Sequence, residues 1–155
     1  MKTKIATLAA LVASLTLAAA AEKIKALNGG RIINSVEPHA EFLVTKDKKI
    51  EIYFLDGTGK VVAPAAQTVT VTMGDRAAPT KLAFTKDGDK LVSDKVIPDG
   101  KELPVVVQIK VTPEAKAVTE KFNLNLADCP TCKHLEYACT CDHGADEKGH
   151  EGHKH

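Results

Sequence analysis

The segment Gln67-Thr68-Val69-Thr70-Val71-Thr72-Met73 alternates threonine with apolar residues over its length. Successive side chains of a strand point to opposite faces of a sheet, so this alternation predicts a β-strand with one face in a core and one in water. Residues 103–111 repeat the pattern and place four apolar side chains on one face: Val105, Val107, Ile109 and Val111. We therefore expect a sheet that is apolar on one side.

Turn signals separate these segments from further short apolar runs. Lys86-Asp87-Gly88-Asp89 contains Asp-Gly, a strong signal for a tight hairpin. Residues 114–120 can hold one helical turn, and in residues 121–126 we expect Phe122, Leu124 and Leu126 to point inward. The predicted strands are residues 32–33, 41–45, 49–55, 67–73, 81–85, 90–92, 103–111 and 121–126.

Seven or eight short strands at spacings of roughly ten residues, with no amphipathic helix between them, predict an all-β protein. The strand rhythm and the length of residues 22–126 are typical of an immunoglobulin-like antiparallel β-sandwich. A domain of this size can be stable without cross-links. All four cysteines lie within residues 129–141, so no disulfide can staple the predicted sandwich.

Residues 1–21 have the composition of a secretory signal peptide. Met1-Lys2-Thr3-Lys4 is basic, residues 5–20 form an uncharged and largely apolar run, and the alanines at its end suit cleavage. The run is shorter than the roughly 20 residues that a transmembrane helix needs. We therefore expect a periplasmic or secreted protein with no membrane span in its mature form.

Charge and motif content argue against two classes of function. Without Lys2 and Lys4 the chain keeps 19 of its 21 basic residues against 20 acidic ones, and no basic stripe favours nucleic-acid binding. The chain has no Trp and no Gly-x-Ser-x-Gly nucleophile motif. Scattered carboxylates such as Glu37 and Glu41 are best explained as strand-outward or turn residues. The sequence therefore predicts a protein that is not an enzyme and does not bind nucleic acid.

Residues 127–155 differ in composition from the rest of the chain. They hold every cysteine and five of the six histidines, and from residue 144 onward they are almost entirely polar. Such a segment cannot bury enough apolar surface to offset its chain entropy, so we expect a flexible tail that is disordered without a ligand. The candidate metal ligands of this tail are Cys129, Cys132, His134, Cys139, Cys141, His143, His150, His153 and His155.

The spacing of these residues favours metal binding. Cys129-x-x-Cys132 and Cys139-x-Cys141 are close thiol pairs, and thiolates and imidazoles are preferred ligands of zinc and copper(I). Binding by the imidazoles should weaken as the pH falls through about 6.5. The thiols can instead pair as disulfides in an oxidising compartment, although a Cys-x-Cys loop is strained. Lys133 separates Cys132 from His134, which disfavours haem attachment, and a thioredoxin-like site would need a βαβ unit.

Four stretches of the predicted sandwich carry a resemblance. They are Leu27-Asn28-Gly29-Gly30-Arg31-Ile32-Ile33, Pro38-His39-Ala40-Glu41-Phe42-Leu43-Val44, and Ile52-Tyr53-Phe54-Leu55-Asp56 followed by Gly59-Lys60-Val61-Val62. Over roughly residues 28–126 the chain resembles small periplasmic β-sandwich proteins, which are related to the N-terminal segments of adaptor proteins in heavy-metal (RND-type) efflux. In that group a histidine often precedes the two glycines. Asn28 stands there in this chain, whereas His39 matches a second histidine of the group.

Two functions follow from these patterns. The first is an exported protein that binds a transition-metal ion, copper or zinc, and buffers it or delivers it to a metal-efflux or other envelope protein. In that case His39 is either a strand-edge residue or part of a second site with Glu37 or Glu41. The alternative is an envelope sandwich with a structural or protein-interaction role, whose cysteines are disulfide-paired and functionally silent. A redox-active tail is a weaker third hypothesis.

Overall fold

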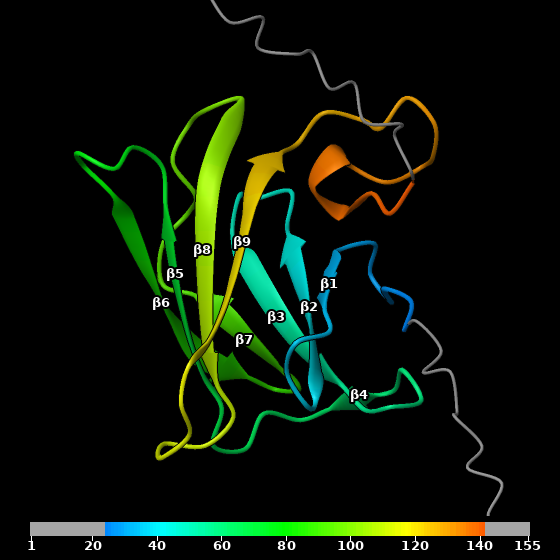
Figure 1. The fold of residues 1–155 in the computed structure, drawn as a ribbon, viewed down its shortest axis with the longest axis vertical. Helices are drawn as coiled ribbons and strands as arrows, with labels where there is room; N and C mark the ends of the chain where they lie inside the picture. Colours follow the sequence, from blue (N-terminus) through cyan, green and yellow to red (C-terminus); the bar gives the residue numbers. More distant parts are fainter. Residues whose placement is uncertain (1–23, 142–155) are drawn as a thin grey trace, which may run out of the picture.

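A computed structural model describes residues 24–141 of the chain (Figure 1). Every strand pair is antiparallel, and the described residues contain no α-helix, so the all-β antiparallel prediction is confirmed. The strands are β1 (Arg31–Ile33), β2 (His39–Val44), β3 (Ile50–Leu55), β4 (Val61–Val62), β5 (Thr68–Met73), β6 (Thr80–Asp87), β7 (Lys90–Ser93), β8 (Glu102–Lys110) and β9 (Val118–Asn125). A short 3-10 helix, η1 (Glu136–Ala138), follows β9.

The strands form one continuous path in the order β1-β2-β3-β7-β6-β5-β8-β9, with β4 attached to β3. Strand β6 joins the two halves of this path, because its residues 80–83 pair with β5 and its residues 84–87 pair with β7. The sheet curls until the two edge strands, β1 and β9, come near each other, so it is nearly closed (Figure 1). The path does not divide into two separate sheets, and an immunoglobulin-like sandwich therefore stays a prediction.

The alternating segments form the centre of the core. Val69, Val71 and Met73 of β5 are buried, and each lies directly opposite a buried residue of β8. The facing residues are Ile109, Val107 and Val105, so the predicted inward face of residues 103–111 is confirmed for these three. Facing apolar pairs on adjacent strands are the unit that stabilises a sheet. The other half of the sheet adds fully buried side chains: Phe42, Ile50, Ile52 and Phe54.

The predicted Asp-Gly hairpin joins β6 to β7. Asp87 pairs with Lys90, which leaves Gly88 and Asp89 as the two loop residues. Gly88 has a φ of +62°, a conformation that glycine adopts without steric cost. The predicted hairpin is therefore confirmed, and glycine stands at the position whose positive φ the turn requires.

Three details at strand ends differ from the prediction. Strand β4 was not predicted, because two residues are too few to show an alternating pattern. Both of its residues are 37% exposed. No helical turn forms in residues 114–120, since β9 begins at Val118. Leu126 is 38% exposed rather than inward, because β9 ends at Asn125, whose side-chain oxygen accepts the N–H of Ala127 at 2.9 Å and turns the chain.

The expectation that Glu41 is an outward or turn residue is wrong. Its side chain is fully buried on β2, and its carboxylate accepts backbone N–H bonds from Leu27, Asn28 and Gly30 at 3.2, 2.8 and 2.9 Å, plus one from the Asn28 side chain. A buried carboxylate is tolerated when hydrogen bonds satisfy it in this way. Glu41 therefore fastens residues 27–30 to the sheet.

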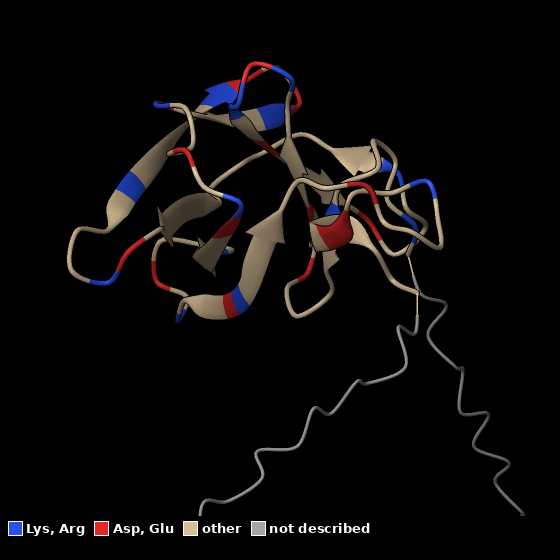
Figure 2. Cartoon of the chain, turned by 90° about the horizontal axis from the view of Figure 1, so that it is seen from above, with Lys and Arg blue, Asp and Glu red and all other residues tan. Residues whose placement is uncertain are grey.

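Charged residues are spread over the strands and loops of both halves. Figure 2 shows basic and acidic positions interspersed along the described chain. This distribution fits the nearly balanced composition. Within residues 24–141, no helix has the length and apolar character that crossing a membrane requires.

Candidate metal centre

Residues 127–141, which we call the Cys loop, follow β9 and fold back on themselves. Asp128 and Leu135 form an isolated antiparallel bridge. The N–H of Cys129 donates to the carbonyl of His134, and the N–H of Glu136 donates to the carbonyl of Ala127, both at 2.9 Å. These bonds make residues 128–135 a small hairpin-like turn. Residues 142–155 lie outside the described residues, and the division of the chain at residue 126 stays a prediction.

The η1 end of the Cys loop packs into the gap between the edge strands. Tyr137 is only 2% exposed, and its ring meets that of Phe42 edge-on with centroids 6.1 Å apart. Its hydroxyl oxygen accepts the N–H of Val44 at 3.0 Å, and its carbonyl accepts a hydrogen bond from Arg31 at 3.3 Å. The guanidinium of Arg31 also lies over the ring of Phe122 on β9. The loop is therefore held by contacts with β1 and β2, while Arg31 links β1 to β9.

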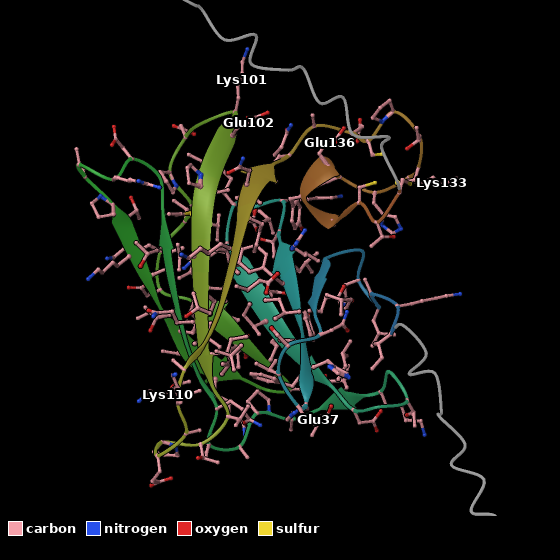
Figure 3. The ribbon with its side chains drawn as sticks, viewed as in Figure 1. Glu37, Lys101, Glu102, Lys110, Lys133 and Glu136 are labelled. Atoms are coloured by element: carbon pink, nitrogen blue, oxygen red, sulfur yellow. The ribbon has the colours of Figure 1, made fainter. Side chains whose placement is uncertain are left out.

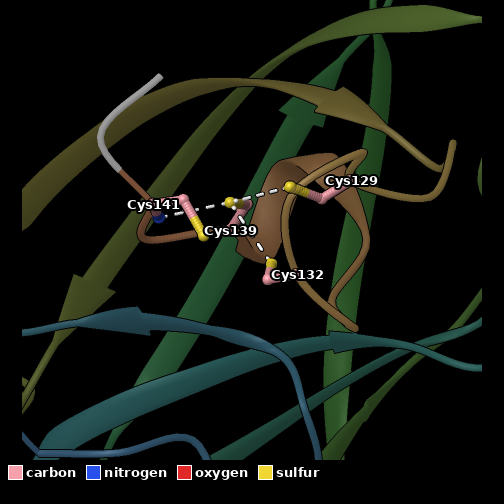
Figure 4. A group of neighbouring side chains, drawn as sticks. All are labelled: Cys129, Cys132, Cys139 and Cys141. Carbon is pink, nitrogen blue, oxygen red and sulfur yellow. Dashed lines mark hydrogen bonds between the residues drawn. The ribbon is translucent and has the colours of Figure 1, made fainter. Parts of the chain in front are cut away.

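The fold of the Cys loop brings its four sulfur atoms together (Figure 4). The sulfurs of Cys129, Cys132, Cys139 and Cys141 all lie within 4.8 Å of one another. The sulfur of Cys139 is 3.2 Å from that of Cys129 and 3.5 Å from that of Cys132. A tetrahedron of thiolates around an ion with metal–sulfur bonds of about 2.3 Å has edges of about 3.8 Å. The four sulfurs thus lie close to the spacing that one tetrahedral ion requires.

Backbone N–H groups point at three of these sulfurs in a repeated pattern. The N–H of Cys141 donates to the sulfur of Cys139 at 3.2 Å. In the same way the N–H of Thr131 contacts the sulfur of Cys129, and that of His134 contacts the sulfur of Cys132. In each case the donor comes two residues after the cysteine. Such bonds favour the negatively charged thiolate and fix its direction.

The thiols have different proton affinities. The Thr131 hydroxyl, 3.2 Å from the sulfur of Cys129, is the main cause that lowers the pKa of Cys129 to about 6. For Cys139 the N–H of Cys141 lowers the pKa, but desolvation and hydrogen bonds with the neighbouring thiols outweigh it and raise the value to about 12. Protons are thus shared unequally, as expected for close thiols that compete for negative charge.

The predicted histidine ligands do not join this cluster within the described residues. His134 lies on the Cys loop, but its Nδ1 sits beside Gly29, 3.8 Å from where a Cβ on Gly29 would be. The group of side chains close enough to share one ion consists of the four cysteines and does not include His134. His143, His150, His153 and His155 lie outside the described residues. The assignment of these histidines as ligands stays a prediction.

His39 is far from the sulfurs. It begins β2, whereas Val44, which contacts the Cys loop, ends that strand about 17 Å away. Figure 3 places Glu37 at the opposite end of the molecule from Lys133 and Glu136 of the loop. The Nε2 of His39 is 3.3 Å from the Glu37 carboxylate. These two side chains form a separate pair, and Glu41 does not join them because its oxygens already accept the N–H bonds of residues 27–30.

A pocket of about 570 Å³ lies beside β5, β8 and β9. Its lining is mainly apolar and includes two basic side chains. The lining residues include Met73, Arg76, Pro79, Pro104, Lys121 and Phe122. None of the residues predicted as ligands lines this pocket, so it is distinct from the sulfur cluster.

Comparison with protein families, with curated proteins and with solved structures finds no match for this chain. Its function is therefore inferred from its own residues. The sequence pointed to the four cysteines through their spacing. It did not point to Tyr137 or Arg31, which hold the Cys loop in place, because their partners on β2 and β9 are distant in sequence. The lone aromatic side chain between the two cysteine pairs was the available signal for Tyr137.

Proposed function

We propose that this chain is an exported metal-binding protein that holds a thiophilic ion, copper or zinc, through Cys129, Cys132, Cys139 and Cys141. The observation that carries this proposal is the gathering of the four sulfurs within 4.8 Å of one another. Thiolates are soft ligands with high affinity for both ions. The histidines beyond residue 141 would add imidazoles through which an ion is captured or passed on, so that the protein buffers the metal or delivers it to an envelope partner.

Two further observations support the binding site. The N–H groups directed at three sulfurs stabilise thiolates, the form in which cysteine binds metal. The buried side chain of Tyr137 keeps the loop that carries the cysteines against the sheet. Export is supported by the signal-peptide composition of residues 1–21.

The test is the metal content of full-length protein purified anaerobically without a tag. We expect close to one equivalent of copper or zinc by elemental mass spectrometry, and its loss when Cys132 and Cys139 are both changed to serine. Lys133→Ser is the matched control, because it alters an exposed residue of the same loop and removes no sulfur. Substitution is preferable to truncation at Leu126, since truncation would also remove the buried Tyr137. Metal-free wild-type protein after growth in metal-rich medium would contradict the proposal.

The alternative function, an interaction sandwich with silent paired cysteines, makes an opposite prediction. A thiol count on unfolded protein, prepared without reductant and with a chelator, should find four thiols if the cysteines hold metal. Paired cysteines would give none. Metal binding needs reduced cysteines, whose thiolates are the ligands.

A further inference from the structure

Two properties of the Cys loop together favour a structural role for a bound ion. The loop's four sulfurs lie within 4.8 Å of one another, close enough to share one ion, and its helical turn fills the gap between the edges of the sheet. We propose that the sulfur cluster is a structural site for a divalent ion of tetrahedral preference, such as Zn²⁺, and that this ion fastens the Cys loop across the gap between β1 and β9. This inference rests on the proposed metal binding, adds the class of ion, and gives the ion held by the four sulfurs a structural role in place of release to a partner.

The class of ion follows from the donor set. Four sulfurs in tetrahedral array are the geometry of zinc or iron sites rather than of square-planar copper(II) or nickel(II). When the protein fills all four positions no open position is left for a water or a substrate, which is the hallmark of structural zinc. The N–H bonds to Cys129, Cys132 and Cys139 spread the negative charge of a tetrathiolate.

The effect on the fold follows from the position of Cys139. It comes directly after η1, whose Tyr137 and Ala138 are buried against the body. The Cys loop thus has two arms, one before η1 and one after it. Cys129 and Cys132 lie on the arm before η1, which begins just after β9 ends. An ion bound to both arms would therefore tie the end of β9 to η1, and through Tyr137 to Val44 on β2 and Arg31 on β1.

The first arm of the test uses Co²⁺ as an optical probe in reduced, full-length protein. Tetrahedral thiolate coordination gives intense visible d–d bands, so we expect these bands to saturate at one equivalent and to disappear when Zn²⁺ is added. They should be lost in the double variant Cys132→Ser and Cys139→Ser, and should remain in Lys133→Ser. Weak bands typical of six-coordinate Co²⁺, or bands that survive loss of the two cysteines, would overturn the proposed ion class.

The second arm measures urea denaturation at buffered concentrations of free Zn²⁺. If the ion binds only the docked loop, each tenfold rise in free Zn²⁺ above the dissociation constant should stabilise the whole protein by about 1.4 kcal/mol. A site on an independent tail would bind Zn²⁺ in the unfolded chain as well and leave the midpoint unchanged. Tyr137→Phe, which removes the hydrogen bond from Val44, should retain the Co²⁺ bands while reducing the Zn²⁺-dependent shift.

The two levels of failure are distinguishable. Absence of any bound metal contradicts the proposed function itself. Bound metal with an unchanged urea midpoint leaves metal binding intact and contradicts only the structural role. Preference for Cu⁺ over Zn²⁺ in direct competition, without tetrahedral Co²⁺ bands, contradicts only the ion class.

Discussion

At the scale of single residues, the buried carboxylate of Glu41 has a large expected effect. It receives three backbone N–H groups and the Asn28 amide, and all of these lose a charged acceptor in Glu41→Gln. Because hydrogen bonds to a charged group are lost and buried donors are left unsatisfied, we expect the free energy of unfolding to fall by roughly 2–3 kcal/mol. Urea denaturation would measure it. Glu37→Gln, at an exposed carboxylate, is the control, and equal effects in the two variants would argue against the fastening role of Glu41.

A second prediction at this scale concerns the glycine that Glu41 holds. A Cβ on Gly30 would lie 2.5 Å from the carbonyl oxygen of Phe42 and 3.0 Å from Cγ of Glu41. The backbone oxygen cannot move without disturbing the β1–β2 pairing, so Gly30→Ala should destabilise the protein by about 2–3 kcal/mol. Gly57→Ala, where nothing lies within 4 Å, should change the thermal midpoint little. A Gly30→Ala protein as stable as the wild type would show that the segment can shift freely.

At the scale of elements, a charged network joins β3 to β7. Burial raises the pKa of Glu51, but hydrogen bonds from Lys90 at 2.6 Å and from Tyr53 at 2.7 Å outweigh it and hold the pKa below its usual 4.5. A lowered pKa in the folded state stabilises the protein above the unfolded value. This stabilisation, about 1 kcal/mol, should be complete above pH 4.5 and be lost as the pH falls through the lowered pKa.

The measurement is the free energy of unfolding of wild type and Glu51→Gln at pH values above and below 4.5. The difference between the two proteins should shrink as the medium becomes acidic. Glu102→Gln, at an exposed position of β8, serves as the matched control and should show a smaller difference from wild type. A constant difference over the whole range would mean that the negative charge of Glu51 contributes nothing.

Arg31 connects elements that the backbone does not pair. Its guanidinium donates to the carbonyl of Tyr137, lies 3.7 Å from the Glu120 carboxylate and stacks 4.7 Å from the ring centroid of Phe122. Lysine keeps the charge but cannot reproduce the planar group. We expect Arg31→Lys to lower stability by about 1–2 kcal/mol and to speed alkylation of the buried Cys129. Arg76→Lys, at an exposed arginine, should do neither; equal alkylation rates would show that Arg31 does not hold the loop.

The sequence predicted individual strands and hairpins better than it predicted the side-chain contacts that hold distant strands together. Alternation over residues 67–73 and the Asp-Gly of the β6–β7 hairpin are local signals, and both were confirmed. Strand β4 has two exposed residues and no pattern to detect. The curling of the sheet depends on side chains such as Arg31 meeting β9 residues about ninety positions away, which no local pattern encodes.

At the scale of the whole molecule, metal removal should loosen the Cys loop before the sheet. Lys133 is an exposed residue on the arm of the loop before η1 and offers a trypsin site. Adding a chelator to Zn²⁺-loaded protein should increase cleavage after Lys133 several-fold, since local opening exposes the backbone. Cleavage after Lys101, in an exposed turn on the body, is the internal reference. Release of metal without faster cleavage after Lys133 would mean that the loop keeps its conformation unaided.

The sequence marked the four cysteines as a group, but it gave no signal for the contacts that hold their loop against the sheet. The cysteine spacing indicated the four candidate thiol ligands but not how many ions they hold, and the four sulfurs lie within 4.8 Å of one another. A separate tail was predicted because residues 127–155 are polar on average. The averaging concealed Leu135, Tyr137 and Ala138, which contact the core. The burial of Tyr137 and Ala138 and the packing of Leu135 depend on the surface available elsewhere in the fold, and composition does not report that surface.

The position of the Cys loop also bears on solubility. Among the described strands, β1 pairs only with β2 and β9 only with β8, so each has one backbone edge without a strand partner. Open edges of this kind recruit strands from other molecules and start aggregation. The Cys loop and the side chain of Arg31 occupy the space between the two edges and so act as a guard against such self-association. If the proposed ion holds this loop in place, protein deprived of the ion should expose both strand edges and aggregate more readily.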